Sequence, residues 1–251
     1  MDEENITGYH GTIKEAAKNI IETQKIDNSI GDEEWLGRGK YFYDRYTNAI
    51  EYNMKKYNEN KNINELISYN NLIINYAILE TTIKCAKEDI LNLDEIIILS
   101  KFVWAWEKIY NKVKENPNFQ KLKYRDGYII DYMINEIPGC KYKVVVKTFD
   151  RITKEFKNRR KDNIVFDSTR IIYEIKQKYI CVKDESVIKK IKENNKNFQK
   201  EYNAIERLIK IVNKGEYYEI WGWEFWRRIF KVVRNKETRW NYRRLKKIYW
   251  Y

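Results

Sequence analysis

The sequence is poor in the residues that build turns, disulfides and metal sites. Its 251 residues include only 2 prolines and 9 glycines, which leaves little material for long turn-rich linkers. The three cysteines, Cys85, Cys140 and Cys181, stand far apart and are odd in number, so they form neither a disulfide framework nor a CxxC metal motif. We therefore expect buried thiols in a reducing compartment, and no bound metal.

Long apolar stretches are absent as well. Nothing in the sequence approaches the roughly 18 apolar residues that a membrane span requires. The first residues, MDEENITGYHG, are acidic and lack the apolar stretch of a signal peptide. The sequence therefore predicts a soluble, cytoplasmic protein without a membrane partner.

Positive charge and aromatic residues, by contrast, are plentiful. Lys and Arg number 49 against 37 Asp and Glu, and 43% of the residues are hydrophobic, so a real core can form. The basic surface suits phosphate backbones or acidic proteins, although a solvated lysine-rich surface accounts for it equally well. Residues 198–251 hold 14 Lys and Arg against 6 Asp and Glu, with five of the 8 tryptophans. We therefore expect a catalytic domain over 1–189 and a basic, Trp-rich helical extension over 190–251 packed on it.

The periodicity of apolar residues predicts an α+β fold. Patterns typical of strands occur at 6–10, 41–43, 73–83, 143–148, 163–166 and 171–182. Patterns typical of helices occur at 13–21, 44–57, 94–106 and 127–137. Asp44 and Asp94 are expected to cap two of these helices, and Pro138-Gly139 to end the last. Helices inserted early and strands clustered late favour α+β over a regular βαβ repeat.

The only histidine, His10, ends the first expected strand and is followed directly by Gly11. A lone histidine is more often structural than catalytic, but glycine beside it allows a ligand to approach the backbone closely. Further along the chain comes Gly37-Arg38-Gly39-Lys40-Tyr41-Phe42, and then the segment Asn48-Ala49-Ile50-Glu51-Tyr52. The ordered series favours a ligand site over a chance combination.

This series resembles the PARP-like ADP-ribosyltransferases of the His-Tyr-Glu type, and in particular their bacterial and phage branch of toxins and defence effectors. The resemblance covers about residues 6–53. It implies the family's ADP-ribosyltransferase-like split β-sandwich with inserted helices, here followed by a C-terminal helical extension. It also implies NAD as the ADP-ribose donor and no metal.

The resemblance further implies roles for individual residues. Backbone groups of Gly11 bind the carboxamide of nicotinamide, and Tyr41 and Tyr52 sandwich its ring. His10 hydrogen-bonds the adenosine ribose, which positions the substrate without proton transfer. The implied cofactor-binding set is His10, Gly11, Thr12, Gly39, Tyr41 and Tyr52.

The family's third catalytic residue, a glutamate at the head of a late strand, has no clear match. The run Tyr-Ile-Cys-Val at 179–182 resembles that strand, but Gln177 and Lys178 precede it and the glutamate upstream is Glu174. Either Glu174 enters through a bulge or another register, or Gln177 takes its place with hydrogen bonding and no charge. A purely structural strand is the third alternative. A neutral residue there implies transfer of single ADP-ribose units.

The C-terminal stretch 221–230 mixes aromatic residues with Arg227 and Arg228, a combination that suits base stacking and phosphate binding. The spacing of Trp226, Ile229 and Phe230 is equally typical of a helix packed on a core. We expect packing for the aromatic residues, with the outward Arg and Lys left to bind nucleic acid or an acidic partner such as an antitoxin.

Together these features predict an NAD-dependent mono-ADP-ribosyltransferase acting as a toxin or phage-defence effector. Its acceptor is a macromolecule, with RNA or DNA slightly favoured over protein because of the basic surface. Two alternatives stand beside it: an NAD glycohydrolase, and a catalytically degenerate module that binds nucleic acid or ADP-ribose.

Overall fold

The computed structural model describes residues 2–29, 34–61, 67–122, 125–150 and 176–214. The chain divides into two compact units, Met1–Gln199 and Lys200–Tyr251. The described residues of the second unit belong to the amphipathic helix α9 (Phe198–Lys214), which begins in the first unit. The sheet and the other helices belong to the first unit.

In the described part of the chain, a seven-stranded sheet has the order β4-β5-β6-β2-β1-β3-β7. Its neighbours pair antiparallel, except β4 and β5, which are parallel. The strands are β1 (Glu3–Ile13), β2 (Lys40–Tyr43), β3 (Tyr76–Ala86), β4 (Ile90–Asn92), β5 (Val144–Asp150), β6 (Lys176–Val182) and β7 (Ile188–Glu193). Helices separate from one mixed sheet confirm the α+β class.

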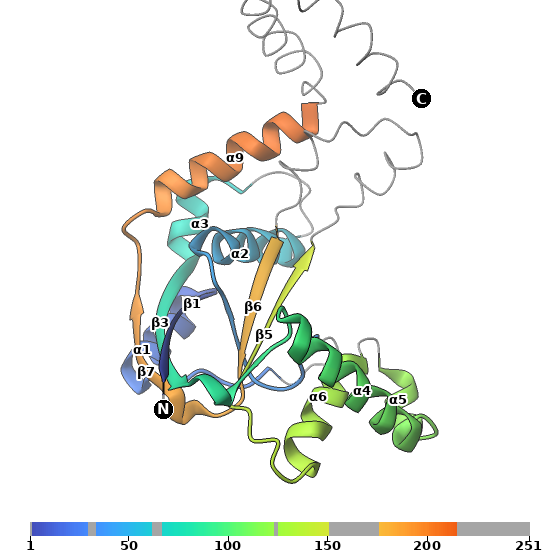
Figure 1. Cartoon of the computed structure of the whole chain (residues 1–251). Helices are drawn as coiled ribbons and strands as arrows, with labels where there is room; N and C mark the ends of the chain where they lie inside the picture. Colours follow the sequence, from blue (N-terminus) through green and yellow to red (C-terminus); the bar gives the residue numbers. More distant parts are fainter. Residues whose placement is uncertain (1, 30–33, 62–66, 123–124, 151–175, 215–251) are drawn as a thin grey trace, which may run out of the picture. The chain divides into compact units, whose positions relative to one another are not determined.

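The helices of the first unit lie on both faces of this sheet (Figure 1). They are α1 (Lys14–Thr23), α2 (Tyr46–Lys61), α3 (Tyr69–Asn75), α4 (Ile96–Val113), α5 (Pro117–Lys121) and α6 (Arg125–Glu136). Two begin at side-chain caps, since Ser68 accepts a hydrogen bond from Asn71 N and Asn116 accepts one from Asn118 N. Short 3₁₀ turns at Lys87–Asp89 and Glu185–Val187 lead into β4 and β7.

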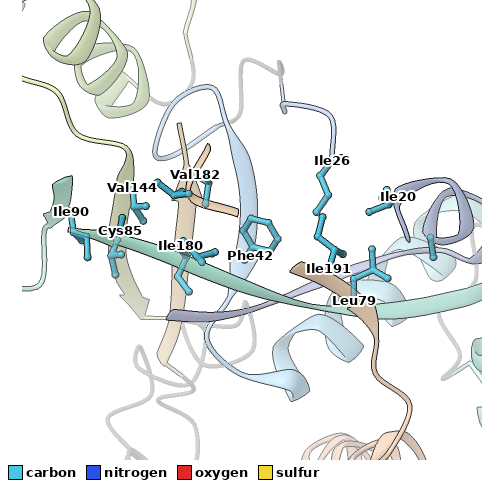
Figure 2. Packing of buried hydrophobic residues seen from close by; sticks show 14 of the residues in the cluster. Ile20, Ile26, Phe42, Leu79, Cys85, Ile90, Val144, Ile180, Val182 and Ile191 are labelled. Atoms are coloured by element: carbon cyan, nitrogen blue, oxygen red, sulfur yellow. The ribbon is translucent and has the colours of Figure 1, made fainter. Parts of the chain in front are cut away.

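One face of the sheet carries a continuous apolar core (Figure 2). Side chains alternate along each strand, so Leu79 and Ile83 of β3 share this face with Phe42 of β2 and Ile180 of β6. Ala17 and Ile20 of α1 pack against it. Burying these side chains removes apolar surface from water and is the main stabilising term of the fold.

The opposite face is covered in two parts. Over the β4-β5-β6 end, Val145 and Cys181 pack with residues of α4, α5 and α6, among them Phe102, Phe119 and Ile130. Helix α2 packs against β1, β2 and β3. Short strand β2 therefore lies where these two helical coverings meet.

The two edges of β1 differ in how they are paired. Along one edge, β1 pairs with β3 without a break from Glu3–Ala86 to Ile13–Tyr76. Along the other, it pairs with β2 at Tyr9–Tyr43. Past that pair the strands separate, and the end of β1 from His10 to Ile13 is paired on one side only.

The structure confirms several elements expected from the sequence. The helix at 13–21 is α1, the strand at 41–43 is β2, and the helix at 127–137 is α6. The strand expected at 171–182 is present as β6 from Lys176 onward. Its first residues, 171–175, lie outside the described residues. So do the strand expected at 163–166 and the aromatic and basic stretch at 221–230. Strand β7 (Ile188–Glu193) crosses residue 189, where the first domain is expected from the sequence to end.

Three local predictions are wrong. Ile73–Asn75 belong to α3 rather than to a strand, because the Ser68 cap starts a helix there. Asp94 does not cap α4: its carboxylate accepts hydrogen bonds from the N and Oγ1 of Thr148, and Glu95 occupies the N-cap position. Asp44 does not cap α2, which begins two residues later, and Asp44 Oδ1 has no partner among the described residues.

Candidate functional site

His10 connects β1 to β2 just past the point where these strands stop pairing. Its Nδ1 lies 2.9 Å from the backbone oxygen of Tyr41, and its ring centroid lies 6.0 Å from that of Phe42. Because a carbonyl oxygen only accepts, Nδ1 carries the proton and Nε2 is left as an acceptor in the neutral ring. Although part of the residue is exposed, desolvation lowers the pKa of His10, and the Tyr41 carbonyl partly opposes this. A neutral ring with an accepting Nε2 suits a hydrogen-bond donor such as a hydroxyl group.

At Gly11, strand β1 approaches α2 closely. A Cβ at this position would lie 2.6 Å from Ala49 O and 2.6 Å from Asn53 Oδ1. Asn53 is fully buried and donates from Nδ2 to Ala77 O on β3 at 3.1 Å, which ties α2 to the sheet. Only glycine therefore fits between β1 and α2 at this level.

Tyr41 is bound to the loop that precedes β2. Its hydroxyl donates to Gly37 O at 2.7 Å and accepts from Leu36 N at 3.0 Å. Burial raises the pKa of the Tyr41 hydroxyl, which therefore stays protonated. The two bonds fix the Tyr41 ring against the loop.

Tyr52 lies in a different setting. It is 36% exposed, its ring centroid is 6.2 Å from that of Tyr43, and Lys56 Nζ lies 5.8 Å from its centroid. No ring contact joins Tyr41 and Tyr52 in the described part of the chain. The structure thus places Tyr52 beside Tyr43, two residues along the same face of β2 from Tyr41.

Tyr43 and Tyr52 belong to a larger aromatic cluster, which consists of Trp35, Tyr43, Tyr52, Phe149 and Tyr179. Tyr43 and Tyr179 lie 5.0 Å apart by ring centroids, and Phe149 lies 4.5 Å from Trp35 and 5.6 Å from Tyr179. Spacings of this size are typical of favourable edge-to-face and tilted aromatic pairs. The cluster therefore forms one aromatic surface across β2, β6 and β5.

Gly39 and Thr12 have plain structural settings. A Cβ at Gly39 would lie 2.6 Å from Cys181 Sγ and 2.7 Å from Val182 O, so glycine lets the start of β2 approach β6. Thr12 pairs with Ala77 in the β1–β3 ladder. Packing explains the glycine at position 39 and strand pairing explains the place of Thr12, so neither residue by itself indicates a bound ligand.

The third catalytic position predicted from the sequence falls partly within the described residues. Gln177 on β6 is 8% exposed, donates from Nε2 to Glu51 Oε2 at 3.3 Å, and accepts from the Tyr179 hydroxyl at 3.1 Å. Glu174 lies outside the described residues. The structure therefore places Gln177 against Glu51, the residue that precedes Tyr52.

Sequence reasoning missed Glu51, Tyr43 and Tyr179. Glu51 and Tyr43 stand beside residues of the motif, one before Tyr52 and two after Tyr41. That adjacency is the signal in the sequence, but the neighbours of these side chains come from β6, more than a hundred residues away.

Two hollows at the described surface lie elsewhere. One, of about 690 Å³, is lined by charged and tyrosine side chains that include Arg38, Lys141 and Asp184. The other, of about 730 Å³, lies against α4 and α6. No residue that the sequence assigns to NAD lines either hollow.

The described residues contain no group of three or more His, Cys, Asp or Glu side chains arranged to hold a metal ion. Of the helices that the structure describes, none is both long and apolar enough to cross a bilayer.

Comparison with known proteins gives one relative of note. The chain is similar to an uncharacterized protein of Methanocaldococcus jannaschii, with 28% identity over 196 residues, or 74% of this chain and 86% of that protein. No family model and no solved structure matches the chain. The name of that relative states no activity.

Proposed function

We propose that the protein is an NAD-dependent mono-ADP-ribosyltransferase of the PARP-like kind. The observation that carries the proposal is the 2.9 Å contact between His10 Nδ1 and Tyr41 O. It joins the first two parts of the motif where β1 and β2 separate, and Gly11 brings α2, which carries Tyr52, against the same end of β1. The split β-sandwich that the resemblance implies stays part of this proposal; the described residues form one seven-stranded sheet in which β1 pairs with β2 at Tyr9–Tyr43.

In this proposal NAD supplies an ADP-ribosyl group whose bond to nicotinamide is weak because nicotinamide is a good leaving group. His10 accepts a hydrogen bond at Nε2 from a ribose hydroxyl, since its Nδ1–H is already engaged with Tyr41 O. The one-sided end of β1 next to Gly11 has backbone groups available for the carboxamide. Tyr52 contributes an aromatic face for the nicotinamide ring.

We further propose a macromolecular acceptor, with nucleic acid ahead of protein. The support is the net charge of +12, with its surplus concentrated in residues 198–251. A role as a toxin or defence effector, held in check by an antitoxin or other inhibitor protein, follows from the same resemblance.

The proposal is tested by incubating the protein with NAD labelled in the adenylate phosphate, together with RNA, DNA and cell lysate. Transfer of label to a macromolecule and release of nicotinamide are expected from the wild type, and both should be lost in His10→Ala and Tyr52→Ala. Thr7→Ala on β1 and Lys55→Ala on α2, both exposed, serve as matched controls that keep activity.

The products separate the alternatives. Free ADP-ribose without labelled macromolecule identifies an NAD glycohydrolase, and binding of NAD without nicotinamide release identifies a degenerate binding module. Intact, unbound NAD in every mixture would contradict the proposal.

A further inference from the structure

The hollow of about 690 Å³ is bounded by α6, by the loops that precede β2 and β5, and by the loop that follows β6. All of its lining residues belong to the first unit. Its volume falls within the range of about 300–1,000 Å³ that is usual for small-molecule sites. Since none of the residues assigned to NAD lines it, the hollow is a candidate for a separate ligand.

An ion pair of low exposure fixes the loop before β2 against α6. Lys183, whose side chain is 8% exposed, donates to Asp131 Oδ1 at 2.7 Å. Its Nζ also donates to Leu36 O at 2.6 Å and to Arg38 O at 2.7 Å. The N–H of Arg38 donates to the other oxygen, Asp131 Oδ2, at 2.7 Å. The backbone of Arg38 is therefore held at both its N–H and its C=O.

The side chain of Arg38, by contrast, has no hydrogen bond or ion pair in the described part of the chain. The residue is exposed and lines the hollow, although its neighbours Leu36, Gly37, Gly39 and Lys40 are buried. A guanidinium offers a planar fork of donors that matches the oxygens of a phosphate. Because the backbone is already fixed, less freedom is lost when this side chain binds a ligand. Arg38 therefore suits a phosphate group.

The charges on the wall are otherwise close to balanced. Four Lys and Arg side chains and three Asp and Glu side chains line the hollow. Lys143 pairs with Asp89 at 2.8 Å, and Asp184 accepts a hydrogen bond from Ser186 N at 2.9 Å, which lowers the pKa of its carboxyl. Glu136, which is exposed, opposes an anion. A balanced wall with one well-placed guanidinium favours a single phosphate over a polyphosphate chain.

Tyrosine side chains form the aromatic part of the wall. Helix α6 contributes Tyr128, Tyr132 and Asn135, at the spacing i, i+4 and i+7 of one helical face. Tyr142 lines the hollow from the loop before β5. Tyr132 and Tyr142 have no ring contact with another aromatic residue among the described residues. Tyrosine rings are the platforms on which proteins stack nucleobases, and the exposed Asn135 amide can both donate and accept hydrogen bonds at a base edge.

We propose that this hollow binds a nucleoside monophosphate, with the phosphate on Arg38 and the base against Tyr132 and Tyr142. The site is separate from the residues assigned to NAD and does not depend on the proposed transferase activity. A free nucleotide and the terminal nucleotide of a nucleic-acid strand present the same phosphate and base, so both are ligands of this class.

The first test titrates full-length protein with each of the four ribonucleoside 5′-monophosphates and with inorganic phosphate, by calorimetry. At least one nucleotide should bind, and more tightly than inorganic phosphate, which has no base to stack. Arg38→Ala should weaken that binding about tenfold or more, because charge-assisted hydrogen bonds are lost. The matched control is Lys101→Ala, which removes an exposed positive charge from the other hollow and should bind as the wild type does. Unchanged thermal midpoints show that both variants fold.

The second test uses the sign of two effects. Glu136→Gln should tighten nucleotide binding about twofold, because it removes an exposed charge that repels the phosphate. Tyr142→Leu should weaken nucleotide binding and leave the binding of inorganic phosphate unchanged. Weaker binding in Glu136→Gln together with tighter binding in Arg38→Ala would overturn the phosphate assignment.

A third arm separates this site from the proposed NAD site. Nucleotide binding should persist in His10→Ala. If it is lost in His10→Ala and kept in Arg38→Ala, the nucleotide occupies the NAD site and the inference is overturned. Equal affinities in Arg38→Ala and Lys101→Ala, or a wild type that binds no nucleotide, overturn it as well. Failure of label transfer from NAD leaves it standing.

A final arm identifies the source of the nucleotide. A short single-stranded oligonucleotide with a 5′-phosphate is titrated beside the free monophosphate that binds best. Tighter binding of the oligonucleotide, with the same loss in Arg38→Ala, identifies a strand end as the ligand. Binding of the monophosphate alone identifies a free nucleotide.

Discussion

Along one edge β1 is paired with β3 over its whole length, and along the other it meets β2 at Tyr9–Tyr43 before the strands separate. The continuous edge lies over the apolar core, with Leu79 and Ile83 fully buried. At the open edge, His10 bonds to Tyr41 O by a side chain where a backbone ladder would otherwise continue. The two edges of β1 therefore differ: the continuous edge stabilises the fold, and the open edge leaves unpaired the polar groups that the proposed NAD site uses.

The largest stability loss is expected on the closed edge. Leu79→Ala removes a fully buried side chain from the apolar core beside α1 and should lower the free energy of unfolding by about 2 to 5 kcal/mol. Thr82→Ala, on the exposed face of the same strand, should change it by less than about 0.5 kcal/mol. Urea unfolding of the two variants measures both values. Equal losses would show that the closed edge does not depend on this core.

A smaller but more selective loss is expected at Gly11. In Gly11→Ala the new methyl group meets Ala49 O and Asn53 Oδ1 at 2.6 Å, so α2 has to move away from β1. Overpacking of this kind costs about 1 to 3 kcal/mol. Thr7→Ala, exposed on the same strand, is the control for unfolding measurements. NAD binding, measured by calorimetry, should weaken in Gly11→Ala; unchanged affinity would separate Gly11 from the proposed site.

Much of the fold follows from local patterns. The helical spacing of Ala17 and Ile20 predicted α1, and the aromatic run at 41–43 predicted β2. Helix caps were less predictable, because an aspartate that precedes an apolar segment can accept hydrogen bonds from residues far away in the sequence instead of capping the helix. Asp94 binds Thr148, 54 residues away, and that pairing is invisible in sequence.

The site was predictable only in part for the same reason. His10, Gly11, Tyr41 and Tyr52 are named by an ordered motif, and β1, β2 and α2 do carry them to neighbouring places. The ring partner of Tyr52 is nevertheless Tyr43. Whether Gln177 reaches this region depends on the register of β6 against β2, which a single sequence does not specify.

The structure also separates the two tyrosines that the sequence treats alike. Tyr41→Phe loses the bonds to Gly37 O and Leu36 N and should cost about 1 kcal/mol or slightly more. Tyr52→Phe should cost less than about 0.5 kcal/mol, since the Tyr52 hydroxyl has no hydrogen bond among the described residues. Both keep an aromatic ring, so NAD affinity should survive in Tyr52→Phe. A larger stability loss in Tyr52→Phe would reverse the contrast.

The smallest expected effect is a pH dependence from the open edge. Burial lowers the pKa of His10 below its ordinary 6.5, so the folded protein keeps the ring neutral at pH values where the unfolded chain already binds a proton. His10 therefore contributes its full stability above pH 6.5, and this contribution declines as the pH falls toward the folded-state pKa. Because His10 is the only histidine, one imidazole proton signal in an NMR titration reports that value directly. Urea unfolding of wild type and His10→Gln between about pH 8 and about pH 5 isolates its share from that of the carboxylates. A wild-type stability that falls no faster than that of His10→Gln would mean that the ring at the open edge is solvated in the folded state.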